Sequence, residues 1–156
     1  MIEVDGSFGE GGGQLLRYSV ALSAILGVPI KVFNIRAKRS NPGLRPQHMT
    51  AVKLIASIVN AEVEGLKVGS MTVTFKPKTP PKGGNYNMNI GTAGSIPLVL
   101  QASLPVLTFA TSTVMLRMIG GTSVRWSPPL PYFKEVLLPL FEKMGVNAEI
   151  KILRRG

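Results

Sequence analysis

The chain contains no cysteine and only one histidine among its 156 residues. Without cysteine there is no disulfide and no thiolate metal site, and a lone histidine does not make a histidine-based zinc centre. The lack of cysteine fits a cytoplasmic protein, which is the location we expect. No window of about 18 uncharged apolar residues occurs, so we predict no membrane-spanning helix and no membrane partner. The first residues also lack the basic-then-apolar order of a signal peptide.

Acidic residues and aromatic rings are scarce as well. Eight acidic residues stand against 18 lysines and arginines, which gives a formal net charge of +10. A small domain of that charge favours polyanionic partners, chiefly nucleic acid and also nucleotides. Solubility or adaptation to high temperature is the alternative explanation. Since aromatic residues make up only 6% of the chain, an extended surface of stacked rings for single-stranded RNA is not evident.

Glycine, by contrast, is concentrated near the N-terminus, where five of the 17 glycines lie between Gly6 and Gly13. They follow an apolar strand-like segment and precede an apolar helix-like run. A strand that enters a glycine-rich turn and then a helix leaves backbone N–H groups free for an anion such as phosphate. Glu10 and Arg17 add an acid and a base. The turn lacks the ending of a P-loop and the spacing of a Rossmann fingerprint, so we exclude both standard nucleotide cradles.

Hydrophobic periodicity predicts six elements in the first half of the chain: a strand at 2–5, a helix at 12–26, a strand at 30–35, a helix at 45–60, and strands at 61–66 and 71–76. A linker rich in proline and glycine follows at 77–84. The order then starts again: a strand at 86–90, a helix to about 110, a strand at 113–118, a helix at 131–143 and a strand at 146–152.

Shifts of 84 and then 86 residues align the two halves and place Arg17 opposite Gln101. We interpret the pattern as an α/β fold of tandem βαβαββ repeats, with unit one at 1–80 and unit two at 85–156. The second unit lacks a counterpart of the strand at 71–76. We therefore expect the chain to be a piece of a longer protein, or to receive that strand from a partner chain.

A basic loop follows the second predicted strand. Its guanidinium groups, on Arg36 and Arg39, suit phosphate oxygens, although plain solvation of a charged loop is the alternative. The single histidine, His48, stands near the start of the next helix. It could act as a general acid or base, as a nucleophile, as a donor to phosphate or as a structural residue.

A second turn of small residues, Gly91–Ser95, precedes the helix that carries Gln101. By the repeat, this turn corresponds to the N-terminal glycine turn. Gln101 is polar in an otherwise apolar helix, so a ligand or a backbone contact is expected for its amide.

Taken together, the motifs resemble those of the RNA 3′-terminal phosphate cyclase family, in the same order and over essentially the whole chain. They are Asp5–Arg17, Arg36-x-x-Arg39, Pro42–His48, Ile90–Ser95 and Gln101. The resemblance implies an enzyme of the ligase class that uses ATP to convert an RNA 3′-phosphate to a 2′,3′-cyclic phosphate, through an adenylated histidine and an RNA-adenylate. It also implies the repeat fold of the cyclases and the enolpyruvyl transferases, and a divalent cation, Mg²⁺ or Mn²⁺.

The resemblance also implies roles for individual residues. Arg17, Arg36 and Arg39 would bind the RNA terminal phosphate or the ATP phosphates. Glu10 would hold the divalent ion or orient an arginine. Gln101 would contact the nucleotide, with His48 nearby.

One departure from the family is large. Its members are about twice this length, and nothing here matches the nucleophilic histidine near their C-terminus. The chain therefore resembles the N-terminal part of the cyclase large domain, 1–156, and we expect it to be inactive alone, completed by a missing C-terminal part or a second copy. The main rival is a non-catalytic, cyclase-like RNA-binding protein of ribosome maturation. An enolpyruvyl transferase is a weaker alternative, because the motifs are not those of that family.

Overall fold

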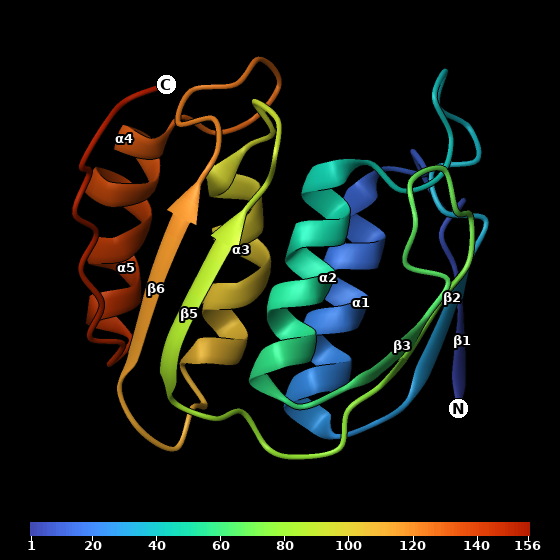
Figure 1. The fold of residues 1–156 in the computed structure, drawn as a ribbon, viewed down its shortest axis with the longest axis horizontal. Coiled ribbons are helices and arrows are strands. Elements are labelled where there is room, and N and C mark those ends of the chain that lie inside the picture. The colour runs from blue at the N-terminus through green and yellow to red at the C-terminus, as the bar shows by residue number, and fades with distance from the viewer.

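The computed structural model describes residues 1–156. The first half forms a four-stranded sheet of order β1-β2-β4-β3 with two helices (Figure 1). Its elements are β1 (Ile2–Asp5), α1 (Gly13–Leu26), β2 (Ile30–Phe33), α2 (Pro46–Ile58), β3 (Glu62–Glu64) and β4 (Val73–Lys76). Strands β1 and β2 are parallel, whereas β4 is antiparallel to both β2 and β3.

The second half begins with the same order of strand, helix and strand. Its elements are β5 (Gly84–Asn89), α3 (Ile96–Leu107), β6 (Val114–Ile119), α4 (Leu130–Tyr132), the π-helical turn η1 (Phe133–Leu137) and α5 (Leu138–Lys143). Strands β5 and β6 pair in parallel as a separate two-stranded sheet. The fold is thus mixed α/β, as the sequence predicts. None of the helices has the length and apolar character needed to cross a bilayer.

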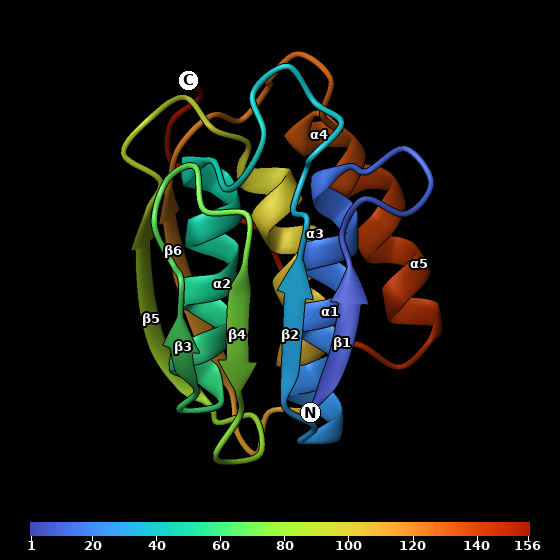
Figure 2. The same ribbon diagram turned by 90° about the vertical axis from the view of Figure 1, so that its right-hand side faces the viewer.

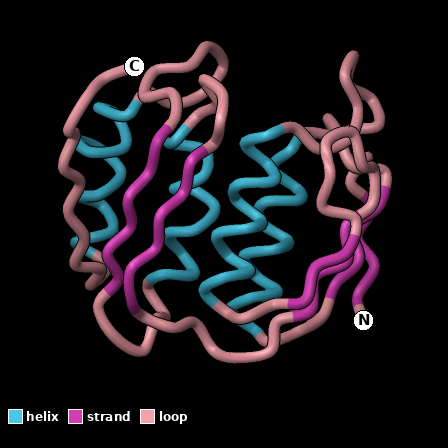
Figure 3. The backbone as a smooth tube through the Cα atoms, viewed as in Figure 1, coloured by secondary structure: helices cyan, strands magenta, loops and turns pink.

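Helices α1, α2 and α3 form the centre of the molecule, with the four-stranded sheet on one side and β5, β6, α4 and α5 on the other (Figures 2 and 3). α1 and α2 cover one face of the four-stranded sheet, and α3 packs against both of these helices. The sheet contributes the cross-strand pairs Ile30–Phe75 and Val32–Val73, which are all buried. Burial of each such side chain stabilises the fold by about 1.5–3 kcal/mol. The main core therefore lies between this sheet and the three helices.

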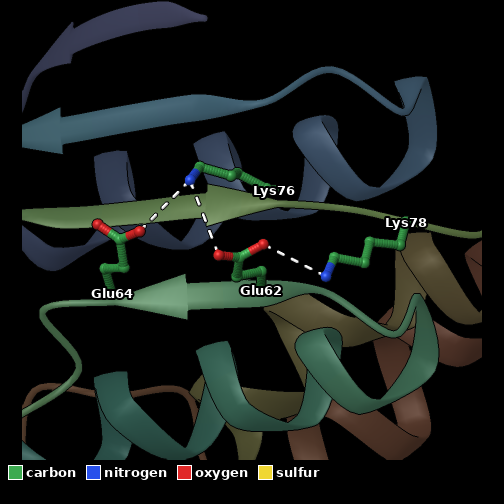
Figure 4. A network of polar contacts seen from close by, with 4 residues as sticks. All are labelled: Glu62, Glu64, Lys76 and Lys78. Carbon is green, nitrogen blue, oxygen red and sulfur yellow. Dashed lines mark hydrogen bonds and ion pairs between the residues drawn. The ribbon is translucent and has the colours of Figure 1, made fainter.

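Charged side chains connect the last two strands of the four-stranded sheet (Figure 4). Lys76 Nζ lies 3.3 Å from Glu64 Oε1 and 3.9 Å from Glu62 Oε1, while Lys78 Nζ lies 3.3 Å from Glu62 Oε2. Such exposed pairs add little stability, but charges on an edge strand such as β3 discourage pairing with another chain.

The prediction of a strand at 146–152 is wrong. These residues follow an irregular path beside α5, and Ile150 and Ile152 pack against a small cluster around Phe133 and Leu138 (Figure 1). The physical reason lies in the pairing of the first half, where β3 forms its ladder only with β4. Residues 1–156 contain no counterpart of β4 in unit two, so the segment has no strand to pair with. The other predicted elements are present, with their ends shifted by a few residues.

Strands β1, β2, β5 and β6 all point their carboxyl ends toward the same end of the molecule (Figures 1 and 2). The turns that follow them gather at that end, which we call the loop face. It consists of residues 6–12, 34–45, 90–95 and 120–129. A hydrogen bond connects the two halves there, because Gln47 Oε1 accepts from the Ser95 N–H at 3.1 Å.

Candidate functional site

The turn between β1 and α1 is held in shape by Asp5. Its Oδ1 accepts from the Ser7 N–H at 2.9 Å, from the Ser7 hydroxyl at 2.8 Å and from Asn34 Nδ2 at 3.3 Å. These hydrogen bonds, the backbone one first, lower the pKa of Asp5. Gly9 and Gly11 have φ of +58° and +59°, a conformation that other residues adopt only with strain. The acid at position 5 thus braces the turn, and the glycines let the chain bend into α1.

Two further glycines allow side chains from other segments to reach the start of α1. A methyl group at Gly13 would collide with His48 Nε2, and one at Gly12 would lie 3.4 Å from Arg39 Nη2. Gly12 is the N-cap residue of α1 and supplies no side chain to cap it. The positive end of this helix is therefore open, with an imidazole and a guanidinium beside it.

His48 is buried in the first turn of α2, with 4% of its surface exposed. Its Nδ1 accepts from the Arg45 N–H at 3.2 Å. Burial, followed by the charges of Arg17, Arg36 and Arg45, lowers the pKa of His48 to about 3. The ring is therefore neutral near pH 7, and because Nδ1 accepts a hydrogen bond, the proton is on Nε2. In this arrangement His48 has no free lone pair for nucleophilic attack, but it can donate from Nε2.

Arg17 lies in the second turn of α1 and is half-buried. No ion pair in the structure includes it, and no carbonyl or side-chain oxygen accepts a hydrogen bond from it. Burial lowers the pKa of its guanidinium, which stays charged near pH 7. A partly buried charge without a protein partner is destabilising, and the Arg17 guanidinium is therefore free to pair with an anion.

Arg36 serves the loop itself. Its φ is +55°, and its Nη1 donates to the carbonyl oxygens of Asn41 at 2.6 Å and Gly43 at 2.9 Å. Burial, together with the charges of Arg45 and Arg39, lowers the pKa of the Arg36 guanidinium. One part of this side chain therefore holds the basic loop, and only its other N–H groups remain available to a ligand.

Arg39 and Glu10 form an exposed ion pair, with Arg39 Nη2 3.6 Å from Glu10 Oε2. The Glu10 side chain is 94% exposed, and the structure holds no group of three or more His, Cys, Asp or Glu residues that could bind a metal ion. Mg²⁺ commonly binds through one or two carboxylates plus substrate phosphates. Glu10 therefore fits an ion that arrives with phosphate groups.

Gln101 lies on α3, in the second half of the chain. It is half-buried on α3 and makes no side-chain hydrogen bond in the structure. No hydrogen bond joins it to Arg17, Arg39 or His48. The first turn of its helix, however, is joined to the start of α2 through Gln47 and Ser95.

Gln47 is a residue of the site whose role the sequence analysis missed. It connects the basic segment of the first half to the small-residue turn of the second half. Gly94 makes this approach possible, because a methyl group there would lie 3.3 Å from Gln47 Cβ. The position of Gln47 immediately before His48 was the available signal, but a contact across 48 residues cannot be read from local spacing.

A cavity of about 590 Å³ lies elsewhere. It is lined by Lys134 and residues 149–155 and contains none of the predicted site residues. The candidate site is instead an open cluster on the loop face, formed by the start of α1, the basic loop and the start of α2.

Comparison with known proteins shows the family of the chain. A family model described as "RNA 3′-terminal phosphate cyclase" matches residues 8–156. Three curated relatives with that name are similar over all 156 residues: 58% identity in Desulfurococcus amylolyticus, 57% in Nitrosospira multiformis and 56% in Pyrococcus furiosus. The chain covers 43%, 44% and 45% of their respective lengths, so it spans less than half of each. Because the family match extends over almost the whole chain, the chain belongs to the RNA 3′-terminal phosphate cyclase family.

Proposed function

We propose that this chain supplies the phosphate-binding part of an ATP-dependent RNA 3′-terminal phosphate cyclase. The observation that carries the proposal is Arg17, a half-buried cation with no protein partner, located one turn above an uncapped helix start. A phosphate dianion bound there would pair with Arg17 and with the free N–H groups of α1. Arg39 and the Nε2–H of His48 would complete the set of donors.

In the reaction that we propose, the RNA 3′-phosphate is activated by AMP from ATP, and the neighbouring 2′-OH then attacks phosphorus. Pyrophosphate leaves when AMP is taken from ATP. In the second step a 2′-O–P bond forms, the P–O bond to AMP breaks, and the 2′-OH proton passes to solvent. The contribution of this chain is to hold the terminal phosphate while charge develops on its oxygens. In such a step a protein accelerates the reaction mainly by holding positive charges that stabilise the charge of the transition state. The ATP phosphates would bind with a divalent ion at Glu10, and Gln101 would contact the nucleotide.

The nucleophile that accepts AMP belongs, in this proposal, to a histidine outside residues 1–156. His48 is unsuited to the role because Nδ1 is engaged by the Arg45 N–H and Nε2 carries the proton. A neutral, buried donor instead suits binding of a phosphate oxygen.

A chimera tests the proposal directly. Residues 1–156 would replace the corresponding segment of the Pyrococcus furiosus relative, to which they are 56% identical. Conversion of a 3′-phosphorylated RNA to the cyclic phosphate, with ATP present, is then measured. Arg17→Gln should reduce this rate at least tenfold, on the order of one charge-assisted hydrogen bond. Arg117→Gln removes the same charge from exposed strand β6 and is the matched control.

Two outcomes would contradict the proposal. Equal losses in the Arg17 and Arg117 variants would remove Arg17 from the site. A chimera that binds 3′-phosphorylated RNA but yields no cyclic phosphate, while the unaltered relative does, would favour the non-catalytic RNA-binding protein.

A further inference from the structure

Trp126 is the only tryptophan of the chain and its most exposed large apolar side chain, with 90% of its surface accessible. It lies in the 120–129 turn of the loop face, between β6 and α4. An indole usually buries most of its area, because its apolar surface is large. A tryptophan held in solvent at this end of the molecule therefore adds nothing to the core.

The backbone at Trp126 is also unfavourable for a large residue. The Ser127 N–H donates to the Val124 carbonyl at 3.1 Å, and the Ser127 hydroxyl donates to the same oxygen at 2.8 Å. Trp126 is thus the third residue of a four-residue turn, and its φ is +66°. A positive φ at that position normally selects glycine or asparagine. Strain of this kind, retained at an exposed ring, indicates a function for the ring.

Hydrogen bonds at the base of the turn fix the backbone that carries the ring. The Leu130 N–H donates to the Thr122 carbonyl at 2.9 Å, and the Thr122 hydroxyl donates to the Gly156 carbonyl at 2.7 Å. Pro128 and Pro129 further restrict the backbone on the way into α4. A ring on a fixed support loses little conformational entropy when a ligand stacks on it.

A positive charge accompanies the ring. Arg125 Cζ lies 5.2 Å from the centroid of the Trp126 ring, within the range of a cation–π contact. Arg125 has no acidic partner among the ion pairs of the structure. The shift of 86 residues that aligns Pro42 with Pro128 also places Arg39 on Arg125. The turn around Trp126 therefore corresponds, by the repeat, to the basic loop of the candidate site.

We infer that Arg125 and Trp126 form a stacking platform for a nucleobase of the RNA strand whose 3′-phosphate binds at Arg17. The inference rests on the proposed function and adds a second point of contact to it. An RNA strand fits better than the adenine of ATP, because a nucleotide pocket buries most of its ligand whereas this ring stands free in solvent. Exposed rings beside cations are the usual platform for single-stranded nucleic acid.

Because Trp126 is the only tryptophan, its fluorescence reports on this position alone. The chain is titrated with a short oligoribonucleotide that carries a 3′-phosphate, with the same strand made abasic near its 3′ end, and with ATP. Binding of each labelled RNA is followed separately by anisotropy. Quenching by the intact strand but not by the abasic strand is expected. Quenching by ATP alone, or equal quenching by both strands, would overturn the inference.

Variants give an independent measurement. Trp126→Ala should weaken binding of the intact RNA roughly 5- to 100-fold, the range for loss of one stacked base, and Trp126→Phe should recover part of it. Phe109→Ala is the matched control, because Phe109 is 60% exposed but lies in the turn that precedes β6, whereas Trp126 lies in the turn that follows it. If the Trp126 and Phe109 variants bind the RNA equally well while Arg17→Gln still weakens binding, the inference of a stacking platform is wrong. The proposed phosphate site at Arg17 is then unaffected. If Arg17→Gln has no effect on binding, the proposed function itself fails.

Discussion

The first helix of each half begins behind a parallel strand, but only one of these helix starts is open to a ligand. The start of α1 has Gly12 as its N-cap and no side chain that caps it. The start of α3 has Ser95, whose Oγ accepts from the Leu98 N–H at 3.3 Å. One turn further along, α1 carries Arg17 where the predicted repeat gives α3 the neutral Gln101. The backbone N–H groups at the helix start thus have no side-chain cap in the first half, whereas a serine side chain caps them in the second half.

The difference extends to packing. Most residues of the main core belong to the first half, whereas β5 and β6 show side chains that are alternately exposed and half-buried. A two-stranded sheet is only marginally stable by itself. The second half therefore depends on the contact of α3 with α1 and α2. A rigid first half is the physical condition for holding several like charges, near His48 and Arg17, in fixed positions.

Acid should affect the first half most, because it contains the only histidine. The unfolded chain protonates His48 near its ordinary pKa of about 6.5, whereas the folded chain resists protonation until about pH 3. The unfolded state thus binds more protons in this window, and the free energy of unfolding should fall as the pH falls, by up to about 1.4 kcal/mol per pH unit.

Urea unfolding at several pH values between 3 and 7 measures this slope. His48→Gln is the control variant, because a glutamine at this position can still accept from the Arg45 N–H and does not titrate. An identical slope in the variant would show that other groups cause the pH dependence.

Glycine turns in the two halves should differ in their tolerance of a methyl group. In Gly13→Ala the new Cβ would meet three atoms of the His48 ring, which is fixed by its bond to Arg45, so we expect a loss of about 1–3 kcal/mol. In Gly94→Ala the closest atom is Ile90 Cγ2, at 2.8 Å, and the overlap is less severe than the one at Gly13. The loss there should be smaller. Thermal unfolding of both variants decides the comparison, and equal losses would mean that the His48 ring is free to move.

Much of the fold was predictable because periodicity is local. The pattern of apolar residues placed α1 and α2 within a few residues, and glycine and proline marked their ends. The strand at 146–152 was predicted wrongly because its residues have strand-like alternation but no partner. Local sequence does not show whether a ladder can form.

In the candidate site, residue types were predictable and partners were not. Arginines in a loop indicate phosphate binding, yet only the structure shows that Arg36 Nη1 donates hydrogen bonds to two carbonyl groups of its own loop. The approach of His48 to Gly13 and the bond from Ser95 to Gln47 depend on how helices pack across long separations. Motif spacing carries no information on such contacts.

The hydrogen bond between Ser95 and Gln47, which connects the two halves, can also be tested by substitution. Gln47→Leu removes the acceptor for the Ser95 N–H and should lower the free energy of unfolding by about 1 kcal/mol, the usual value of such a hydrogen bond. Gln47→Glu keeps an acceptor oxygen and is the matched control. Hydrogen exchange at the Ser95 amide should become faster in the leucine variant alone. Unchanged exchange in that variant would show that another acceptor takes the place of Gln47.

The smallest effect is expected at Glu10. Its ion pair with Arg39 is exposed and 3.6 Å long, so Glu10→Gln should leave the thermal unfolding midpoint unchanged within error. If Glu10 serves the ion that accompanies the ATP phosphates, the same variant should raise the concentration of Mg²⁺ or Mn²⁺ needed for half-maximal activity in the chimera with the Pyrococcus furiosus relative. Glu3→Gln breaks a comparable exposed pair with Lys31, which is 3.3 Å long and lies far from the loop face at the start of β1, and should leave the metal requirement unchanged. Equal metal requirements in the two variants would limit Glu10 to orienting Arg39. The open half of the molecule would then bind its anion with arginines and backbone N–H groups alone.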